Sequence, residues 1–291
     1  RINDIENGYD IKITDDGTNE TISLVKVSDI TEGAVARIGS TTYPTLSAAF
    51  AAASDNELTE IELLQDVITA AKINIPDTKN IRFNYNGHKI DFLGTYEFIN
   101  NNGSLYVYDD SGDVKTSNTW SKKLFLNNGT LVYNDINYSA YTTSDYTSIS
   151  NYESSYKQYS PKIIENNAIA TIESGTITGG TFKGIIQNNE NANMVINNGN
   201  INTVYNVGNL EVHGGTFNSK INNTYYDNIF YNYGTIVVDG GTYPNNNGLF
   251  IYNTGIATID SVTYNYTSFA ETTGNMELSN NKIKGTIENT G

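Results

Sequence analysis

The fold is decided by a short stretch that reads YNVGNLEVHGGTF, from Tyr205 to Phe217. It holds an Asn-x-Gly motif, then apolar residues at every second position, Leu210 and Val212, and then Gly-Gly-Thr. Apolar residues with a period of two indicate a short β-strand with one buried face, and glycines at both ends indicate turns. The stretch therefore predicts part of a coil built from short strands and sharp corners.

The Asn-x-Gly motif recurs along the chain. Full copies are Asn101-Asn102-Gly103, Asn127-Asn128-Gly129, Asn206-Val207-Gly208, Asn232-Tyr233-Gly234, Asn253-Thr254-Gly255 and Asn289-Thr290-Gly291. Two copies lack the glycine, Asn166-Asn167-Ala168 and Asn188-Asn189-Glu190, and Thr272-Thr273-Gly274 lacks the asparagine. The Gly-Gly-Thr element recurs at Gly179 and Gly240, with degenerate copies at Ser261 and Asn280.

The spacing of these motifs selects the architecture. Successive copies are 26, 39, 22, 18, 26, 21, 19 and 17 residues apart. A period near 20 with β-strand patterning favours the coils of a right-handed parallel β-helix, since propeller blades need about 40 residues and leucine-rich repeats carry a helical side. The long steps are interpreted as coils with inserted loops. The fold class predicted is all-β, a solenoid with a short N-terminal capping helix.

The repeated asparagines are predicted to stack at one corner, about 4.8 Å apart from coil to coil. Their side-chain amides would form a hydrogen-bonded ladder, with asparagine tolerating a left-handed backbone and glycine supplying a positive φ. The ladder is expected to contain Asn101, Asn127, Asn166, Asn188, Asn206, Asn232 and Asn253.

The N-terminal part is patterned differently, and two units are expected, 1–34 and 35–291. In the first, strands at Tyr9–Ile13 and Thr21–Val25 are joined by a turn, which predicts a hairpin. In the second, the alanine-rich segment 46–53 predicts a helix that covers the open end of the solenoid. Because the chain ends inside a repeat motif at Asn289, the solenoid is expected to continue in a longer protein.

Three stretches carry a resemblance to a known family: 36–39 (ARIG), 43–49 (YPTLSAA) and 61–67 (IELLQDV), followed by the 84–90 segment NYNGHKI. Together they resemble the opening of pectin-lyase-like β-helix modules of large surface proteins in Gram-positive gut bacteria. The resemblance covers roughly 36–291. It implies an extracellular, cell-surface location and an adhesin-like family, while the wider fold also includes polysaccharide lyases and hydrolases.

Composition limits the classes of partner. The net charge of −15 disfavours nucleic acid and anionic membrane surfaces. No apolar run reaches the roughly 20 residues of a membrane span, so no membrane insertion is expected from this fragment. The absence of cysteine excludes disulfides and cysteine-based metal sites. A secreted monomer without a cofactor is expected.

Candidate catalytic groups are few. Arg82 lies in an early coil without a matching aspartate cluster, as a pectate lyase would need, and the two histidines, His88 and His213, are far apart in sequence. Asp109, Asp110 and Asp113 form the densest acidic segment, for which an acidic loop is favoured and a weak calcium site is an alternative. No catalytic residue and no metal site are assigned. Ice binding needs an array of Thr-x-Thr motifs on successive coils. One such motif occurs at Thr176–Thr178, but neighbouring coils do not repeat it, so ice binding is disfavoured.

A tyrosine-rich insert within the 39-residue step is the predicted binding site. It has almost no aliphatic residues, so it is expected to project from the solenoid, and projecting loops on rigid scaffolds often carry function. The alternative is a decoration without a ligand. The preceding insert, which carries Trp120, is expected to lie on the same side of the solenoid. The predicted contacts are Trp120, Tyr138, Tyr141, Tyr146, Tyr152, Tyr156 and Tyr159.

The function expected from these observations is that of a non-catalytic bacterial surface protein, an adhesin or stalk. Its partner is expected among host or environmental carbohydrates or host surface proteins. The alternative is a carbohydrate-active enzyme, a polysaccharide lyase or a glycoside hydrolase, of the same fold.

Overall fold

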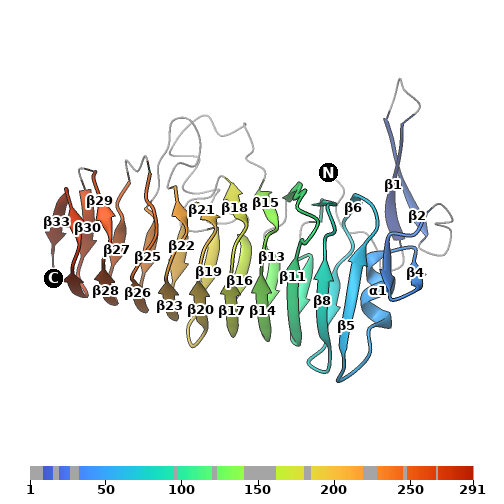
Figure 1. Ribbon diagram of the computed structural model, residues 1–291, viewed down its shortest axis with the longest axis horizontal. Helices are drawn as coiled ribbons and strands as arrows, with labels where there is room; N and C mark the ends of the chain where they lie inside the picture. The colour runs from blue at the N-terminus through green and yellow to red at the C-terminus, as the bar shows by residue number, and fades with distance from the viewer. Residues whose placement is uncertain are drawn as a thin grey trace.

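A computed structural model of the chain describes residues 9–15, 20–26, 33–94, 97–119, 123–140, 162–179, 185–218, 228–244, 248–266 and 268–290. Most of these residues form a parallel β-solenoid, whose strands lie side by side along the long axis in Figure 1. The predicted all-β solenoid is therefore confirmed. Each coil contributes strands to long sheets that run along the axis.

The first long sheet has ten strands, all parallel to their neighbours. Along the axis they are β7 (Ile73–Ile75), β10 (Ile99–Asn101), β13 (Lys123–Asn127), β16 (Lys162–Asn166), β19 (Ile186–Asn188), β22 (Val204–Asn206), β25 (Phe230–Asn232), β27 (Ile251–Asn253), β30 (Ser268–Thr272) and β33 (Thr286–Asn289).

The second long sheet has twelve strands, and its first two pairings are antiparallel. In order they are β4 (Thr41–Tyr43), β3 (Ala36–Ile38), β5 (Leu58–Leu63), β8 (Asn80–Asn84), β11 (Ser104–Tyr108), β14 (Thr130–Tyr133), β17 (Ile169–Ile172), β20 (Asn193–Ile196), β23 (Asn209–Val212), β26 (Thr235–Val238), β28 (Ile256–Asp260) and β31 (Asn275–Ser279).

Shorter sheets complete the structure. A seven-stranded sheet contains β6 (Val67–Thr69), β9 (Ile90–Phe92), β12 (Thr116–Thr119), β15 (Asn137–Ala140), β18 (Thr176–Gly179), β21 (Asn200–Ile201) and β24 (Thr216–Phe217). Two further pairs are β29 (Thr263–Tyr264) with β32 (Lys282–Ile283), and the antiparallel hairpin of β1 (Tyr9–Asp15) with β2 (Glu20–Lys26).

The core is a set of columns that run along the axis. In the ten-stranded sheet Val204 pairs with Phe230, and Phe230 with Ile251, and all three are buried. Burying a side chain of this size contributes about 1.5–3 kcal/mol. In each of these three-residue strands the first and third side chains are buried, and the middle side chain faces outward.

The predicted N-terminal helix is α1 (Leu46–Ala52), the single helix within the described ranges. Thr45 caps it, because its hydroxyl oxygen accepts a hydrogen bond from the Ala48 amide at 3.1 Å. Phe50 is buried and meets the ring of Phe83 edge-on at 5.0 Å between centroids. The helix therefore covers the apolar end of the solenoid that the sequence predicted would need a cap.

The corner glycines act differently from the prediction. In the Asn-x-Gly motif, Gly208 and Gly234 do not have positive φ, and no ladder asparagine does either. A Cβ on Gly234 would lie 2.2 Å from the carbonyl oxygen of Gly208, so these glycines allow adjacent coils to approach closely. Positive φ is found at the second glycine of the Gly-Gly-Thr element, with 104° at both Gly215 and Gly241.

Candidate functional site

A row of side chains, most of them facing outward, follows the middle positions of the ten-stranded sheet. The pairing places these residues in one column, in which mixed residues at the N-terminal end are followed by three tyrosines and then by two glutamates. From the N-terminal end it contains Asn74, Asn100, Leu126, Glu165, Gln187, Tyr205, Tyr231, Tyr252, Glu271 and Glu288.

Four tyrosines gather in the aromatic part and are called here the tyrosine strip: Tyr205, Tyr231, Tyr233 and Tyr252. Ring centroids of Tyr205 and Tyr231 are 6.4 Å apart, and those of Tyr231 and Tyr252 are 6.2 Å apart. Tyr233, at the neighbouring corner position, lies 5.1 Å from Tyr205 and 6.0 Å from Tyr252. The side chain of Tyr233 is exposed and the other three are half-buried, so the strip is a platform open to solvent.

Two phenol groups of the strip, those of Tyr205 and Tyr233, have raised pKa values. Partial burial raises the pKa of Tyr205 above its ordinary value. Burial also raises the pKa of Tyr233, and the neighbouring phenols of Tyr205 and Tyr252 add to the effect. The hydroxyls of Tyr205 and Tyr233 therefore stay protonated near neutral pH, and each can donate and accept a hydrogen bond at the edge of an apolar ring.

The asparagine ladder holds the strip in place, because each of three strip tyrosines directly precedes a ladder asparagine. Asn206 donates from Nδ2 to Oδ1 of Asn232 at 2.8 Å, and Asn232 donates to Asn253 at 2.7 Å. Each Nδ2 also donates to a backbone carbonyl of the next coil, as Asn206 does to Thr235 at 2.9 Å. The hydrogen bonds of these three asparagines hold their strands in register. They therefore also fix the positions of the preceding residues, Tyr205, Tyr231 and Tyr252.

All seven asparagines predicted for the ladder lie in one buried row, directly after the outward column. The side chain of each one donates a hydrogen bond to the next coil. The remaining contacts run from Asn101 to Asn127 at 2.8 Å, Asn127 to Asn166 at 2.7 Å, Asn166 to Asn188 at 2.8 Å and Asn188 to Asn206 at 2.8 Å. At the C-terminal end Asn253 donates to the Thr272 hydroxyl at 3.2 Å. At the other end Asn101 pairs with Ile75, and its Oδ1 is buried without a hydrogen-bond partner.

A second row of amides lies one residue further along each turn. Asn128 donates to Asn102 at 3.1 Å, and Asn167 donates to Asn128 at 2.7 Å. Asn189 continues the row by donating to Asn167 at 2.5 Å. In this outer row each amide donates to the coil before it, whereas in the buried ladder each amide donates to the coil after it. Tyr233 takes the corresponding corner position two coils after Asn189.

Most of the insert predicted as the binding site lies outside the described residues, namely Trp120, Tyr141, Tyr146, Tyr152, Tyr156 and Tyr159. Tyr138 is described, and the expectation that it projects is wrong. It belongs to β15 and is 0% exposed, and its hydroxyl lies 2.7 Å from that of Tyr85. The buried pair satisfies its polar atoms internally, so a tyrosine can belong to the core here.

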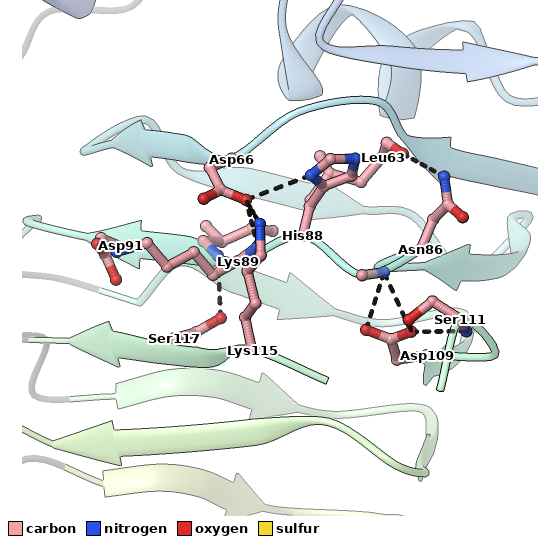
Figure 2. Close-up of polar contacts among 12 residues, drawn as sticks. Leu63, Asp66, Asn86, His88, Lys89, Asp91, Asp109, Ser111, Lys115 and Ser117 are labelled. Carbon is pink, nitrogen blue, oxygen red and sulfur yellow. Dashed lines mark hydrogen bonds and ion pairs between the residues drawn. The ribbon is translucent and has the colours of Figure 1, made fainter. Parts of the chain in front are cut away.

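The acidic segment at Asp109 is part of a corner, as Figure 2 shows. Asp109 is buried and accepts hydrogen bonds from the Gly87 amide at 3.1 Å and from the Ser111 amide at 2.9 Å and hydroxyl at 2.5 Å. Asp110 accepts from the Asn84 amide at 2.7 Å. These contacts use the Asp109 carboxylate to join two coils.

A second carboxylate in Figure 2 joins two more corners. Asp66 accepts from Lys115 at 3.0 Å, from the Lys89 backbone amide at 3.2 Å and from His88 at 3.3 Å. Burial alone would raise the pKa of Asp66, but these three contacts outweigh it and hold the pKa below its ordinary value. His88 therefore belongs to a structural ion-pair group.

His213 and Arg82 also have neighbours that explain them. His213 lies between Asp239, 2.9 Å from its Nδ1, and Glu211, 3.3 Å from its Nε2. Arg82 lies over the rings of Tyr106 and Tyr108, at 5.1 and 4.8 Å. Across the described part of the chain, no group of three or more His, Cys, Asp or Glu could hold a metal ion. Nor is any described helix long and apolar enough to cross a membrane.

The strip was missed in the sequence, although a signal for it was present. Tyrosine directly precedes the ladder asparagine in three successive copies, at 205–206, 231–232 and 252–253. The ladder asparagine is buried, so the residue before it faces outward.

Comparison with known proteins identifies no relative of this chain: no family model, no curated protein and no solved structure matches it.

Proposed function

We propose that this chain is a non-catalytic, pectin-lyase-like β-helix module of a surface protein from a Gram-positive bacterium, and that its tyrosine strip binds carbohydrate. The single observation that carries the proposal is the row of four solvent-accessible tyrosine rings with neighbouring centroids 5.1–6.4 Å apart. The cell-surface location and the bacterial source rest on the resemblance of residues 36–90 to such modules.

The chemistry of the strip suits a sugar chain. Sugars present apolar C–H faces with hydroxyl groups at their edges, and tyrosine offers an apolar ring with a polar tip. The strip is also held rigidly, because each of its strands is locked by a buried ladder amide on one side and a core residue on the other. A rigid platform loses little conformational freedom on binding, which favours affinity.

The test is binding of the purified chain to an array of neutral, acidic and amine-bearing oligosaccharides, with affinities measured by calorimetry. A Tyr231→Ala, Tyr252→Ala double variant is expected to bind at least about tenfold more weakly, which corresponds to about 1.4 kcal/mol. The matched control is Tyr106→Ala, which removes an outward tyrosine from the twelve-stranded sheet and should keep full affinity. Thermal unfolding of each variant checks that the fold is retained.

Two results would overturn the proposal. One is the absence of binding to any oligosaccharide by the wild-type chain. The other is binding that the double variant retains in full. The same mixtures are analysed for cleaved products, because cleavage would favour the alternative of a carbohydrate-active enzyme of this fold.

A further inference from the structure

The column that carries the strip ends in two carboxylates. Glu271 pairs with Tyr252 across the ten-stranded sheet, and Glu288 pairs with Glu271 in the next coil. Both face outward, Glu271 half-buried and Glu288 exposed. Aromatic rings and carboxylates are therefore continuous along one line on the surface.

We infer that the ligand of this surface is a positively charged glycan, a polymer of amino sugars with free amines. The inference rests on the proposed function and names the class of carbohydrate. In it, the sugar rings lie on Tyr205, Tyr231 and Tyr252, and the protonated amines lie beside Glu271 and Glu288.

An internal comparison supports the role of the two glutamates. Glu165 occupies the same column nearer the N-terminus, but it is buried and paired with Lys123 at 2.9 Å. Within the part of the chain that the structure describes, Glu271 and Glu288 form no ion pair. The carboxylate on the N-terminal side of the strip is therefore neutralised within the protein. The two carboxylates on its C-terminal side are open to a cation of the ligand.

Charge complementarity favours a cation over a neutral or acidic sugar. A cation is attracted to the face of an aromatic ring at an exposed site, and an ammonium near a carboxylate adds an exposed ion pair. The net charge of −15 attracts cations to the whole molecule and repels polysaccharides that carry carboxylates. Several modest contacts, repeated along a polymer, are needed for useful affinity.

The experiment compares fully deacetylated glucosamine oligomers with N-acetylglucosamine oligomers of equal length, at a pH where the amines are protonated. The glucosamine oligomers are expected to bind at least about tenfold more tightly, with a preference that shrinks as salt is added. A Glu271→Gln, Glu288→Gln double variant should lose this preference. The matched control is Glu277→Gln, an exposed glutamate of the twelve-stranded sheet in the same final coils, which should keep it.

The outcomes separate this inference from the proposed function. Equal binding of both oligomers that still depends on the tyrosines overturns the inference and leaves the proposed function standing. If neither oligomer binds, the inference is overturned. The proposed function is then decided by whether other glycans on the array bind. Oligolysine that binds as tightly, regardless of the tyrosines, would show attraction by charge alone and also overturn the inference.

Discussion

The Nδ2 atom of Asn206 lies 2.8 Å from the Oδ1 atom of Asn232, and both side chains are buried. The same head-to-tail contact joins seven asparagines from Asn101 to Asn253, with every amide pointing the same way along the axis. Aligned hydrogen bonds polarise one another, so such a chain can be stronger than its separate contacts. The ladder joins seven of the ten strands of this sheet, from β10 to β27, in one register.

Replacing Asn206 with alanine should lower the free energy of unfolding by about 1–3 kcal/mol, because it leaves a donor of Asn188 and an acceptor of Asn232 unpaired in the interior. Chemical denaturation measures the change. Asn193→Ala is the control, since the residue is exposed and its side chain accepts a hydrogen bond from Asn209 at 3.0 Å, while its backbone contacts are kept in the variant. Equal effects of the two variants would contradict a special role for the ladder.

Gly234→Ala should also destabilise the chain, by about 1–3 kcal/mol or more, because the new Cβ would lie 2.2 Å from one backbone oxygen and 2.3 Å from another. Neither oxygen can move without disturbing the coil before it. Ala168→Gly is the matched control, since Ala168 occupies the same position in a coil that already accepts a Cβ. Its effect on unfolding should be small, and a neutral Gly234→Ala would show that the coils are less tightly stacked than described.

The ladder can be extended at its C-terminal end. Thr272 pairs with Asn253 on one side and with Asn289 on the other, and it interrupts the asparagine column. Thr272→Asn should raise the free energy of unfolding by about 0.5–1.5 kcal/mol through the restored amide contacts. The control is Thr258→Asn on the outward face of β28, which should change little. Destabilisation by Thr272→Asn would mean that the hydroxyl contact to Gly274 at 3.0 Å matters more.

His213 should titrate above its ordinary range. The hydrogen bond to Asp239 is the main cause that raises its pKa, with Glu211 adding to it, so the imidazolium is favoured in the folded chain. Its contribution to stability is full below the unfolded pKa of about 6.5 and is lost as the pH rises through the higher folded pKa. With two histidines in the chain, NMR titration resolves it. Asp239→Asn should lower the measured pKa, and an unchanged pKa would contradict the assigned contact.

Much of the fold could be predicted because it depends on local patterns. The Asn-x-Gly spacing and the alternation at Leu210 and Val212 were enough to predict the parallel solenoid, and the alanine-rich segment predicted α1. The role of glycine could not be predicted, since sequence does not distinguish Gly234, which allows close approach, from Gly241, which has a positive φ. Only the stacking of one coil on the next separates these roles.

The candidate site was harder to predict than the fold. Tyr138 looked like part of a projecting loop because few aliphatic residues surround it in sequence, but a hydrogen bond to Tyr85, 53 residues away, lets it lie in the core. Conversely, Tyr205, Tyr231 and Tyr252 are separated by whole coils, and their contact arises only from the parallel pairing of β22, β25 and β27. Long-range register, which sequence gives only indirectly, creates the strip.

The most direct test of the binding surface is an NMR titration of the chain, carrying ring-labelled and individually assigned tyrosines, with the oligosaccharide that binds most tightly. The largest shifts are expected on Tyr205, Tyr231, Tyr233 and Tyr252, while the buried Tyr85 and Tyr138 should not respond. Shifts confined to Tyr141, Tyr146, Tyr152, Tyr156 and Tyr159 would place the site in the insert and contradict the assignment to the tyrosine strip.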